Sequence, residues 1–264
     1  MKLTHYTIIG KDINLLKGHV ENVKHYAGFD ELQCEKEFLV IVYTNPKIPR
    51  NVTSDILEYC WEEGLRTVVY DEPEENSFLE NLYACFNLGY EEAKGEYVFR
   101  SGSDQAFCKG AFPAMMKHAE PGVILQANTV ENHEKLQELK THSRHFEVIV
   151  GNDFEELNLD KFENIQDQLK ARTSSELLSI DEAINAWGKP AAFNSSLGVI
   201  NRTDGCSWLM RRKDWEKFGP MPPIENGITG DVIIHDRMQK AGYRNFIVRD
   251  CLTVHFVQGE QSKK

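Results

Sequence analysis

The sequence has little of what marks several common protein classes. Its six cysteines show no C-x-x-C spacing, so the sequence suggests neither a zinc ribbon nor a dithiol redox motif, and we expect reduced, partly buried thiols in a cytoplasmic protein. No apolar run reaches the roughly 18 residues that a membrane-spanning helix needs, and the N-terminus shows no secretory signal. Acidic residues outnumber basic ones by 41 to 30, so the formal net charge is −11 and there is no general nucleic-acid-binding signal.

What is present in the first half is an alternation of strand and helix patterns. Apolar spacing predicts strands over 6–9, 37–43, 66–70 and 97–100, and helices over 13–26, 54–63 and 78–93. We expect Ser54 to cap the second helix and Gly95 to end the third. The run 37–43 is apolar almost throughout, as in a strand buried on both faces of a parallel sheet. Repeated β-α units of this length predict an α/β fold, with a mostly parallel central sheet flanked by helices.

The second half is less regular. A strand is predicted over 123–126, and the strongly polar stretch 131–185 indicates helices and loops of an insertion, with a disordered segment as the alternative. The pattern then returns, with a strand over 208–210, helices over 212–218 and 231–242, and extended segments over 245–248 and 253–257. We therefore divide the chain into 1–120, 121–204 and 205–264.

The most informative segment runs from Asn87 to Gln105. A helix is followed by a glycine, and a short buried strand then ends in a polar turn that contains Asp104. Ligands of open α/β sheets bind outside the carboxyl ends of the strands. Mg²⁺ and Mn²⁺ prefer oxygen ligands and share them with substrate phosphates. Asp104 is therefore a candidate ligand for a divalent cation, and the plainer alternative is a turn-forming aspartate.

The helix and strand also carry a spaced pattern, Asn87-x-Gly89-x-x-x-Ala93-x-Gly95-Glu96-Tyr97-Val98. This pattern resembles the corresponding segment of family 2 glycosyltransferases, which have the GT-A (Rossmann-like) fold. In that family the strand leads into a D-x-D motif that binds a metal and a nucleotide diphosphate. On this chain the motif falls on Gly102-Ser103-Asp104, so a glycine replaces the first acid, and Gln105 stands where a further Asp often follows.

A second segment, Gly205 to His255, resembles the acceptor half of the same family. A strand ending in Arg211-Arg212 precedes a helix that begins Gly230-Asp231 and an extended segment that ends in Val254-His255-Phe256. The family usually has Glu-Asp at the start of this helix, so the Glu is replaced here and the Asp is kept. The resemblance implies that Asp231 is the catalytic base and that His255 ligates the metal or touches the diphosphate.

The implied activity is a metal-assisted transfer of a sugar, with inversion, from a nucleotide-diphosphate donor to an acceptor hydroxyl. A carboxylate takes the proton of the attacking hydroxyl, and Mn²⁺ or Mg²⁺ held by Asp104 and His255 stabilises the leaving diphosphate. The resemblance places nucleotide-sugar contacts at the ends of the predicted strands and near the helix that follows the third: Gly10, Lys11, Asp12, Thr44, Asn45, Asn81, Arg100, Ser103 and Asp104.

Two other hypotheses share this fold. A catalytically inactive nucleotide-sugar-binding module is favoured by the glycines at positions 102 and 230, whereas a sugar-nucleotide nucleotidyltransferase would need a Gly-rich basic loop that residues 9–14 do not supply. The acceptor stays open between a glycan, a small molecule and a modified nucleobase. The three segments are predicted to be the nucleotide-sugar-binding half, a polar insertion on the acceptor side, and the catalytic half of one GT-A domain. Three histidines in the insertion (His133, His142 and His145) fit no standard zinc spacing.

Overall fold

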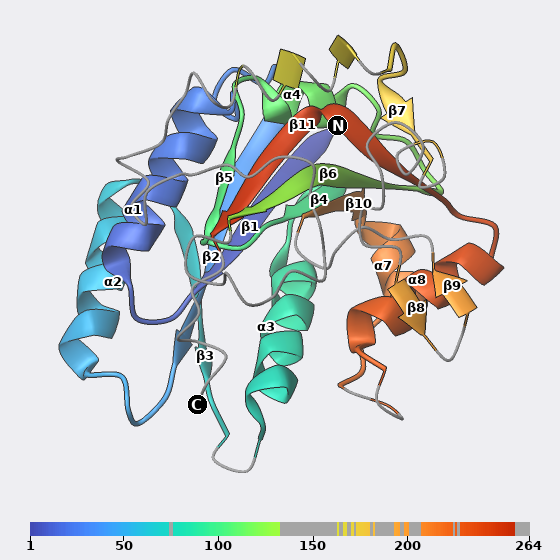
Figure 1. The fold of residues 1–264 in the computed structure, drawn as a ribbon. Coiled ribbons are helices and arrows are strands. Elements are labelled where there is room, and N and C mark those ends of the chain that lie inside the picture. The colour runs from blue at the N-terminus through green and yellow to red at the C-terminus, as the bar shows by residue number, and fades with distance from the viewer. Residues whose placement is uncertain are drawn as a thin grey trace.

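The structure, a computed structural model, describes residues 1–73, 76–132, 173–179, 207–223 and 228–256, with short pieces between 163 and 200 and residue 225. In this part of the chain a central sheet has the strand order β3-β2-β1-β4-β10-β6-β11-β5, with β7 beside β11 (Figure 1). The strands are β1 (Lys2–Ile9), β2 (Glu35–Thr44), β3 (Arg66–Asp71), β4 (Tyr97–Arg100), β5 (Gln105–Phe107), β6 (Val123–Asn132), β7 (Leu177–Leu178), β10 (Trp208–Arg211) and β11 (Arg244–Phe256). A separate hairpin joins β8 (Phe193–Ser195) to β9 (Gly198–Ile200).

The sheet changes direction at β10. Strands β3, β2, β1 and β4 run parallel to their neighbours, as do β6 and β11, whereas β10 is antiparallel to both β4 and β6. Strands β5 and β7 are antiparallel to β11. The predicted α/β sheet is confirmed, and its parallel N-terminal half brings the carboxyl ends of four strands to one edge.

Helices cover both faces of the sheet (Figure 1). One hydrophobic core lies under α1 (Ile13–Glu21), α2 (Arg50–Glu62) and α4 (Ala111–Met116), and α1 continues as the π-helix η1 (Asn22–Tyr26). The other core lies under α3 (Phe78–Glu92), α7 (Arg212–Phe218) and α8 (Gly230–Lys240). Strand β2 serves both cores, because Val40 and Val42 face the first and Leu39 and Ile41 face the second. Among the described residues, no helix is both long and apolar enough to span a membrane.

The glycines of the helix-strand pattern are explained by close packing against β1. A Cβ atom on Gly89 would overlap the ring of Tyr6, and one on Gly95 would overlap the backbone nitrogen of Thr4. Only glycine allows this approach of backbone to its neighbours. The pattern therefore fixes how closely α3 and the start of β4 lie to the first strand.

Two predicted helix ends are wrong. Helix α2 begins at Arg50 after Pro49, and Ser54 lies inside it, where its Oγ donates to the Arg50 carbonyl at 3.0 Å. Proline fixes a backbone angle suited to a helix start, and this outweighs the capping preference of serine. Helix α3 ends at Glu92 and its capping residue is Ala93, which is extended, so Gly95 is not its cap.

Further differences concern the second half and the short elements. The two extended segments predicted over 245–248 and 253–257 form one strand, β11, with an irregularity between Val248 and Leu252. The three-residue β5 and the six-residue α4 were not predicted, because both are too short for a periodic signal. Most of 131–185 lies outside the described residues. Of the six cysteines, five are described, and all five are free thiols.

Candidate active site

The candidate site lies at the edge where β1, β2, β3 and β4 end. These strands finish at Ile9, Thr44, Asp71 and Arg100, and β10 starts at the same edge because Trp208 pairs with Arg100. The predicted donor-site residues all lie at this edge or in the loops and helix that follow it. This edge is the position where open α/β sheets bind ligands, and the contacts of these residues with a nucleotide sugar stay a prediction.

Asp104 and His255 meet at this edge although 151 residues separate them in the chain. Strand β5 pairs antiparallel with β11, which places His255 opposite Gln105, the neighbour of Asp104. The Asp104 Oδ2 and His255 Nε2 atoms are 3.2 Å apart. Burial alone would raise the pKa of Asp104, but the charge and hydrogen bond of His255 together hold it below its ordinary value. An ionised carboxylate beside an imidazole is a donor pair suited to a divalent cation.

The carboxylate of Asp104 folds back over position 102. A Cβ atom on Gly102 would overlap Oδ1 of Asp104, the rotatable end of that side chain, so a side chain at position 102 would require the Asp104 carboxylate to turn away. Gln105 holds the turn from the other side, because its Oε1 accepts hydrogen bonds from the Gly102 backbone nitrogen and from Ser207 Oγ, each at 2.8 Å. Ser103 is buried within the turn.

The donor set fits a hard divalent cation that takes its remaining ligands from phosphates and water. No group of three or more His, Cys, Asp or Glu side chains that could hold a metal ion occurs among the described residues. Asp104 and His255 would thus supply two protein ligands. Mg²⁺ in particular is usually held by one or two carboxylates together with substrate phosphates and several waters.

Two buried histidines lie beneath this turn. His5 Nδ1 faces the Phe99 carbonyl at 3.1 Å and His19 Nδ1 faces the Gln105 carbonyl at 2.7 Å, so both Nδ1 atoms carry the proton. The two Nε2 atoms face Ser101 Oγ, at 3.4 Å from His5 and 3.2 Å from His19. Burial lowers the pKa of His19 to about 4 and that of His5 well below its ordinary value. Sequence reasoning missed this pair, because neither histidine belongs to a recognisable motif.

The loop after β1 contains three of the predicted nucleotide-binding residues. Gly10 and Lys11 follow the strand, and Lys11 is exposed. Asp12 caps α1, with its Oδ1 accepting from the backbone nitrogens of Asn14 and Leu15, each at 3.1 Å. These capping bonds explain why an aspartate stands at position 12 without any bound ligand. Its contact with a nucleotide stays a prediction.

The ends of β2 and β3 form a polar and aromatic cluster with the start of α3. The rings of Tyr43 and Tyr70 stack at 6.3 Å between centroids, and the Tyr70 hydroxyl donates to Asn81 Oδ1 at 2.9 Å. Asn81 is buried and donates to Glu72 Oε1 at 2.8 Å. Burial, helped by the hydrogen bond to Glu72, raises the pKa of Tyr43 to about 12. Glu72 is an acid near the predicted base pocket that the sequence did not single out.

Thr44 and Asn45 close the same cluster. Asn45 Nδ2 donates to the Tyr43 hydroxyl at 3.3 Å, and its Oδ1 accepts from the backbone nitrogen of Lys47 at 2.9 Å. Thr44 is half-buried and ends β2. Asn45 thus joins the cluster through the Tyr43 hydroxyl, and the Thr44 carbonyl accepts from the backbone nitrogen of Glu72 at 2.9 Å, while nucleotide contacts of both residues stay a prediction.

Asp231 lies in the first turn of α8 and is 6% exposed. The Tyr83 hydroxyl of α3 donates to Asp231 Oδ1 at 3.1 Å. A Cβ atom on Gly230 would overlap the carbonyl oxygen of Pro222, so the preceding loop packs directly on the start of the helix. This contact explains why glycine stands where the family has Glu.

The loop that packs there is held by Asn87 of α3. Asn87 Nδ2 donates to the Met221 carbonyl at 2.9 Å, and the Met221 nitrogen donates to Asn87 Oδ1 at 2.8 Å. The first residue of the helix-strand pattern thus fixes the loop that leads to Asp231. Two hydrogen bonds therefore join the helix-strand pattern of α3 and β4 to the loop at Met221.

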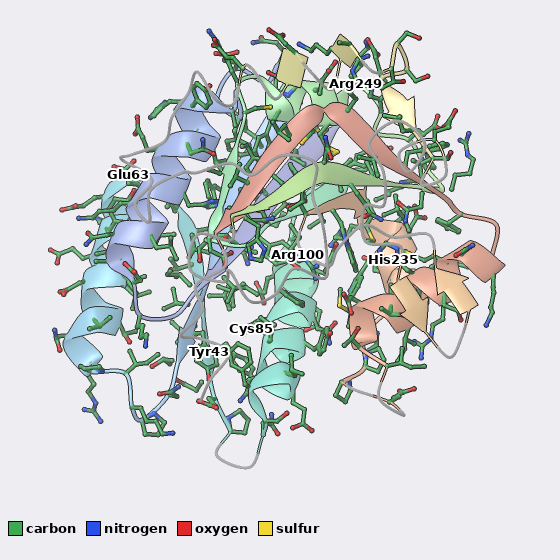
Figure 2. All side chains as sticks on the ribbon, viewed as in Figure 1. Tyr43, Glu63, Cys85, Arg100, His235 and Arg249 are labelled. Carbon is green, nitrogen blue, oxygen red and sulfur yellow. The ribbon has the colours of Figure 1, made fainter. Side chains whose placement is uncertain are left out.

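Arg100 is not at the surface of the site. Its side chain is fully buried on the face of the sheet that α3 covers (Figure 2), whereas its neighbours Phe99 and Ser101 face the other way. A pocket of about 290 Å³ lies farther along α8, lined by Ile124, Ser179, His235, Gln239, Tyr243, Arg244, Asn245 and Phe246. His235 is one helical turn beyond Asp231, so this pocket begins close to the predicted base.

The sheet order, the switch of direction at β10 and the edge where the carboxyl ends of β1, β2, β3 and β4 meet define the GT-A fold. Solved glycosyltransferases share it. A structure of GalNAc-T7 with UDP, GalNAc and Mn²⁺ has a TM-score of 0.60 and 12% identity, covering 98% of this chain and 44% of that one. The mannosyltransferase PcManGT from Pyrobaculum calidifontis, in complex with GDP-Man and Mn²⁺, has a TM-score of 0.55 and 15% identity, covering 98% and 57%.

This chain therefore spans about half the length of those two glycosyltransferases, and at such low identity the likeness establishes the fold. No protein-family model matches the sequence, and no curated protein matches it. The GT-A prediction is confirmed, and membership of family 2 stays a prediction. The three histidines of the insertion lie outside the described residues.

Proposed function

We propose that the protein is a divalent-metal-assisted glycosyltransferase that moves a sugar from a nucleoside-diphosphate donor to an acceptor hydroxyl. The observation that carries this proposal is the 3.2 Å contact between Asp104 and His255 at the ligand-binding edge of a GT-A sheet. A metal-binding role gives a reason for two distant strand ends to bring a carboxylate and an imidazole together in that place.

In this proposal the residues divide the work. A divalent cation would supply Lewis-acid stabilisation of the diphosphate when bound. Asp104 and His255 would hold it in place, and the cluster of Tyr43, Asn45 and Asn81 receives the nucleoside. Asp231 accepts the proton of the acceptor hydroxyl while its oxygen attacks the anomeric carbon opposite the leaving diphosphate, and this single displacement gives inversion.

The test is a panel of nucleotide sugars, assayed for hydrolysis and transfer with and without Mn²⁺. Asp231→Ala should lower turnover by about 10²–10⁴-fold while nucleotide binding, measured by calorimetry, stays near the wild-type value. Asp104→Ala should abolish the Mn²⁺-dependent gain in nucleotide binding. Asp55→Ala, an exposed carboxylate on α2, is the matched control and should change neither.

A catalytically inactive nucleotide-sugar-binding module is the second candidate, and the glycine at position 102 favours it, because Asp104 is then the one carboxylate of this turn available to a metal. Nucleotide binding without turnover for any donor, in wild type and in Asp231→Ala alike, would support that module. Equal and mild effects of Asp104→Ala and Asp231→Ala on binding and turnover would reject both candidates.

A further inference from the structure

Strand β3 stands at the margin of the central sheet, where it pairs on one side with β2. Among the described residues, no strand or loop forms backbone hydrogen bonds with its other side. Val69, in the middle of this margin, is 43% exposed, whereas its partner Val42 on β2 is fully buried. Sheets commonly protect such margins with proline, lysine or a bulge, and β3 contains none of these. Its charges, Arg66 and Asp71, stand at its two ends.

The register with β2 shows which backbone groups of β3 face outward. The Glu72 nitrogen donates to the Thr44 carbonyl at 2.9 Å, and Thr44 lies opposite Asp71. Successive residues of a strand direct their N–H and C=O groups alternately to one side and to the other. The backbone groups of Thr67, Val69 and Asp71 therefore point away from β2, and those of the residues between them point toward it.

Strand β3 is complementary to an antiparallel copy of itself. A two-fold axis perpendicular to the sheet keeps each face on its own side, so Val69 stands opposite its own copy and Thr67 stands opposite Asp71. All three residues have outward backbone groups, as the hydrogen-bonded pairs of an antiparallel ladder require. The side chains of Thr67 and Asp71 share the face of Val40, which belongs to the core under α2. The hydroxyl of one copy can therefore donate to the carboxylate of the other.

The opposite face of the same pairing brings unlike charges together. Arg66 stands opposite Glu72 on the face that α3 covers, and its Nη1 donates to the carbonyl of Glu92 on α3 at 2.5 Å. Unlike charges that face each other across antiparallel strands stabilise the pairing, whereas like charges destabilise it. The pairing places Arg66 of each copy beside Glu72 of the other, once on each side of the axis.

A shift of the axis removes this match. Moving it one residue toward the start of the strand would set Asp71 opposite the apolar Leu65. Moving it one residue toward the end would set Thr67 opposite Pro73, which has no backbone N–H to donate. Charge and backbone complementarity thus select one register, with the axis at Val69.

We propose that β3 is the interface through which two copies of this chain form a symmetric dimer, with their sheets joined across Val69. The occupant is a second copy because each end of β3 meets its complement in the same segment. One strand from each copy makes a small interface, so the dimer is reversible. Glu72 also accepts from Asn81 at 2.8 Å, which places the candidate nucleoside cluster next to the interface. The dimer does not depend on the proposed function.

The first test is the molar mass of the full chain over a series of concentrations, measured by sedimentation. We expect a dimer whose share rises with concentration. Val69→Pro removes an outward N–H at the axis and leaves the pairing with β2 intact. Because the axis repeats the change, two intermolecular hydrogen bonds are lost, and the dissociation constant should rise about 30-fold or more. Val69→Thr keeps the N–H and the β-branched shape, so it should dimerise like the wild type.

The second test reads the register. Opposite residues of a hydrogen-bonded pair have Cα atoms about 5.5 Å apart, which a disulfide can span. Val69→Cys should therefore give a disulfide-linked dimer under mild oxidation. Thr67→Cys, which faces Asp71 of the other copy and not itself, should stay unlinked. The wild type, treated in the same way, shows any linkage through its own cysteines.

A chain that stays monomeric at every concentration would overturn the proposal, and so would a dimer that Val69→Pro leaves unchanged. Equal crosslinking of Val69→Cys and Thr67→Cys would also overturn it, because the axis would then not lie at Val69. Turnover of a nucleotide sugar enters none of these measurements. A failure of the proposed function is therefore distinguishable from a failure of the dimer.

Discussion

The pair of buried histidines beneath the Asp104 turn makes the stability of the protein depend on pH. His5 and His19 both carry Nδ1 protons bonded to backbone carbonyls, and both have pKa values held down by burial. The folded state therefore resists protonation, whereas the unfolded chain takes up protons as the pH falls through about 6.5. Stability is fully present above that value and is lost as the pH falls toward the folded pKa.

The magnitude follows from His19, whose pKa falls from 6.5 to about 4. When the pH falls from about 7.5 to about 5.5, protonation of His19 stabilises the unfolded state by about 1.3 kcal/mol, whereas His19 in the folded state stays almost entirely neutral. The free energy of unfolding therefore falls by that amount. His5 adds a loss of the same sign. The measurement is the urea-unfolding free energy of metal-free protein at several pH values in this window.

The control is His19→Asn, whose side-chain amide can keep the bond to the Gln105 carbonyl but does not titrate. This variant should be less stable at neutral pH because packing is lost, yet its loss of stability over the same window should be smaller by about 1.3 kcal/mol. An identical pH dependence in wild type and His19→Asn would refute the reasoning.

Three further predictions concern the close contacts of the site. Gly102→Ala should displace the Asp104 carboxylate and weaken Mn²⁺ binding measured by calorimetry; unchanged affinity would show that the turn has spare room. Asn87→Ala should remove both hydrogen bonds to Met221 and cost about 1–3 kcal/mol in thermal or urea unfolding, with faster proteolysis near 219–229 as the local sign. Gly230→Ala should disturb the start of α8 and speed amide exchange there, and wild-type exchange rates would contradict the observed packing.

The parallel half of the fold could be predicted because its signals are local. The apolar run of β2 and the helix-strand pattern that ends in Tyr97 each identify an element from neighbouring residues alone. The pairing of Asp104 with His255 also followed, but only through the family resemblance, since nothing in the spacing of two residues 151 positions apart requires contact.

The remainder depends on long-range packing that a sequence pattern does not encode. The burial of Arg100 differs from what the sequence indicates, because a charged residue at a strand end is ordinarily a ligand contact rather than a core residue. The reason for glycine at position 230 lies in the carbonyl of Pro222, which only the folded chain brings close. Glu72 was missed because it follows β3 without a motif of its own.

Strand β10 has a consequence for how the protein is made. It lies between β4 and β6 in the sheet, yet about 100 residues separate Arg100 from its partner Trp208. During synthesis, at about 5–20 residues per second, the facing edges of β4 and β6 must wait without a partner until β10 leaves the ribosome. Open strand edges of this kind favour pairing with other chains, so a nascent chain that stops short of Arg211 should need chaperones and should aggregate without them.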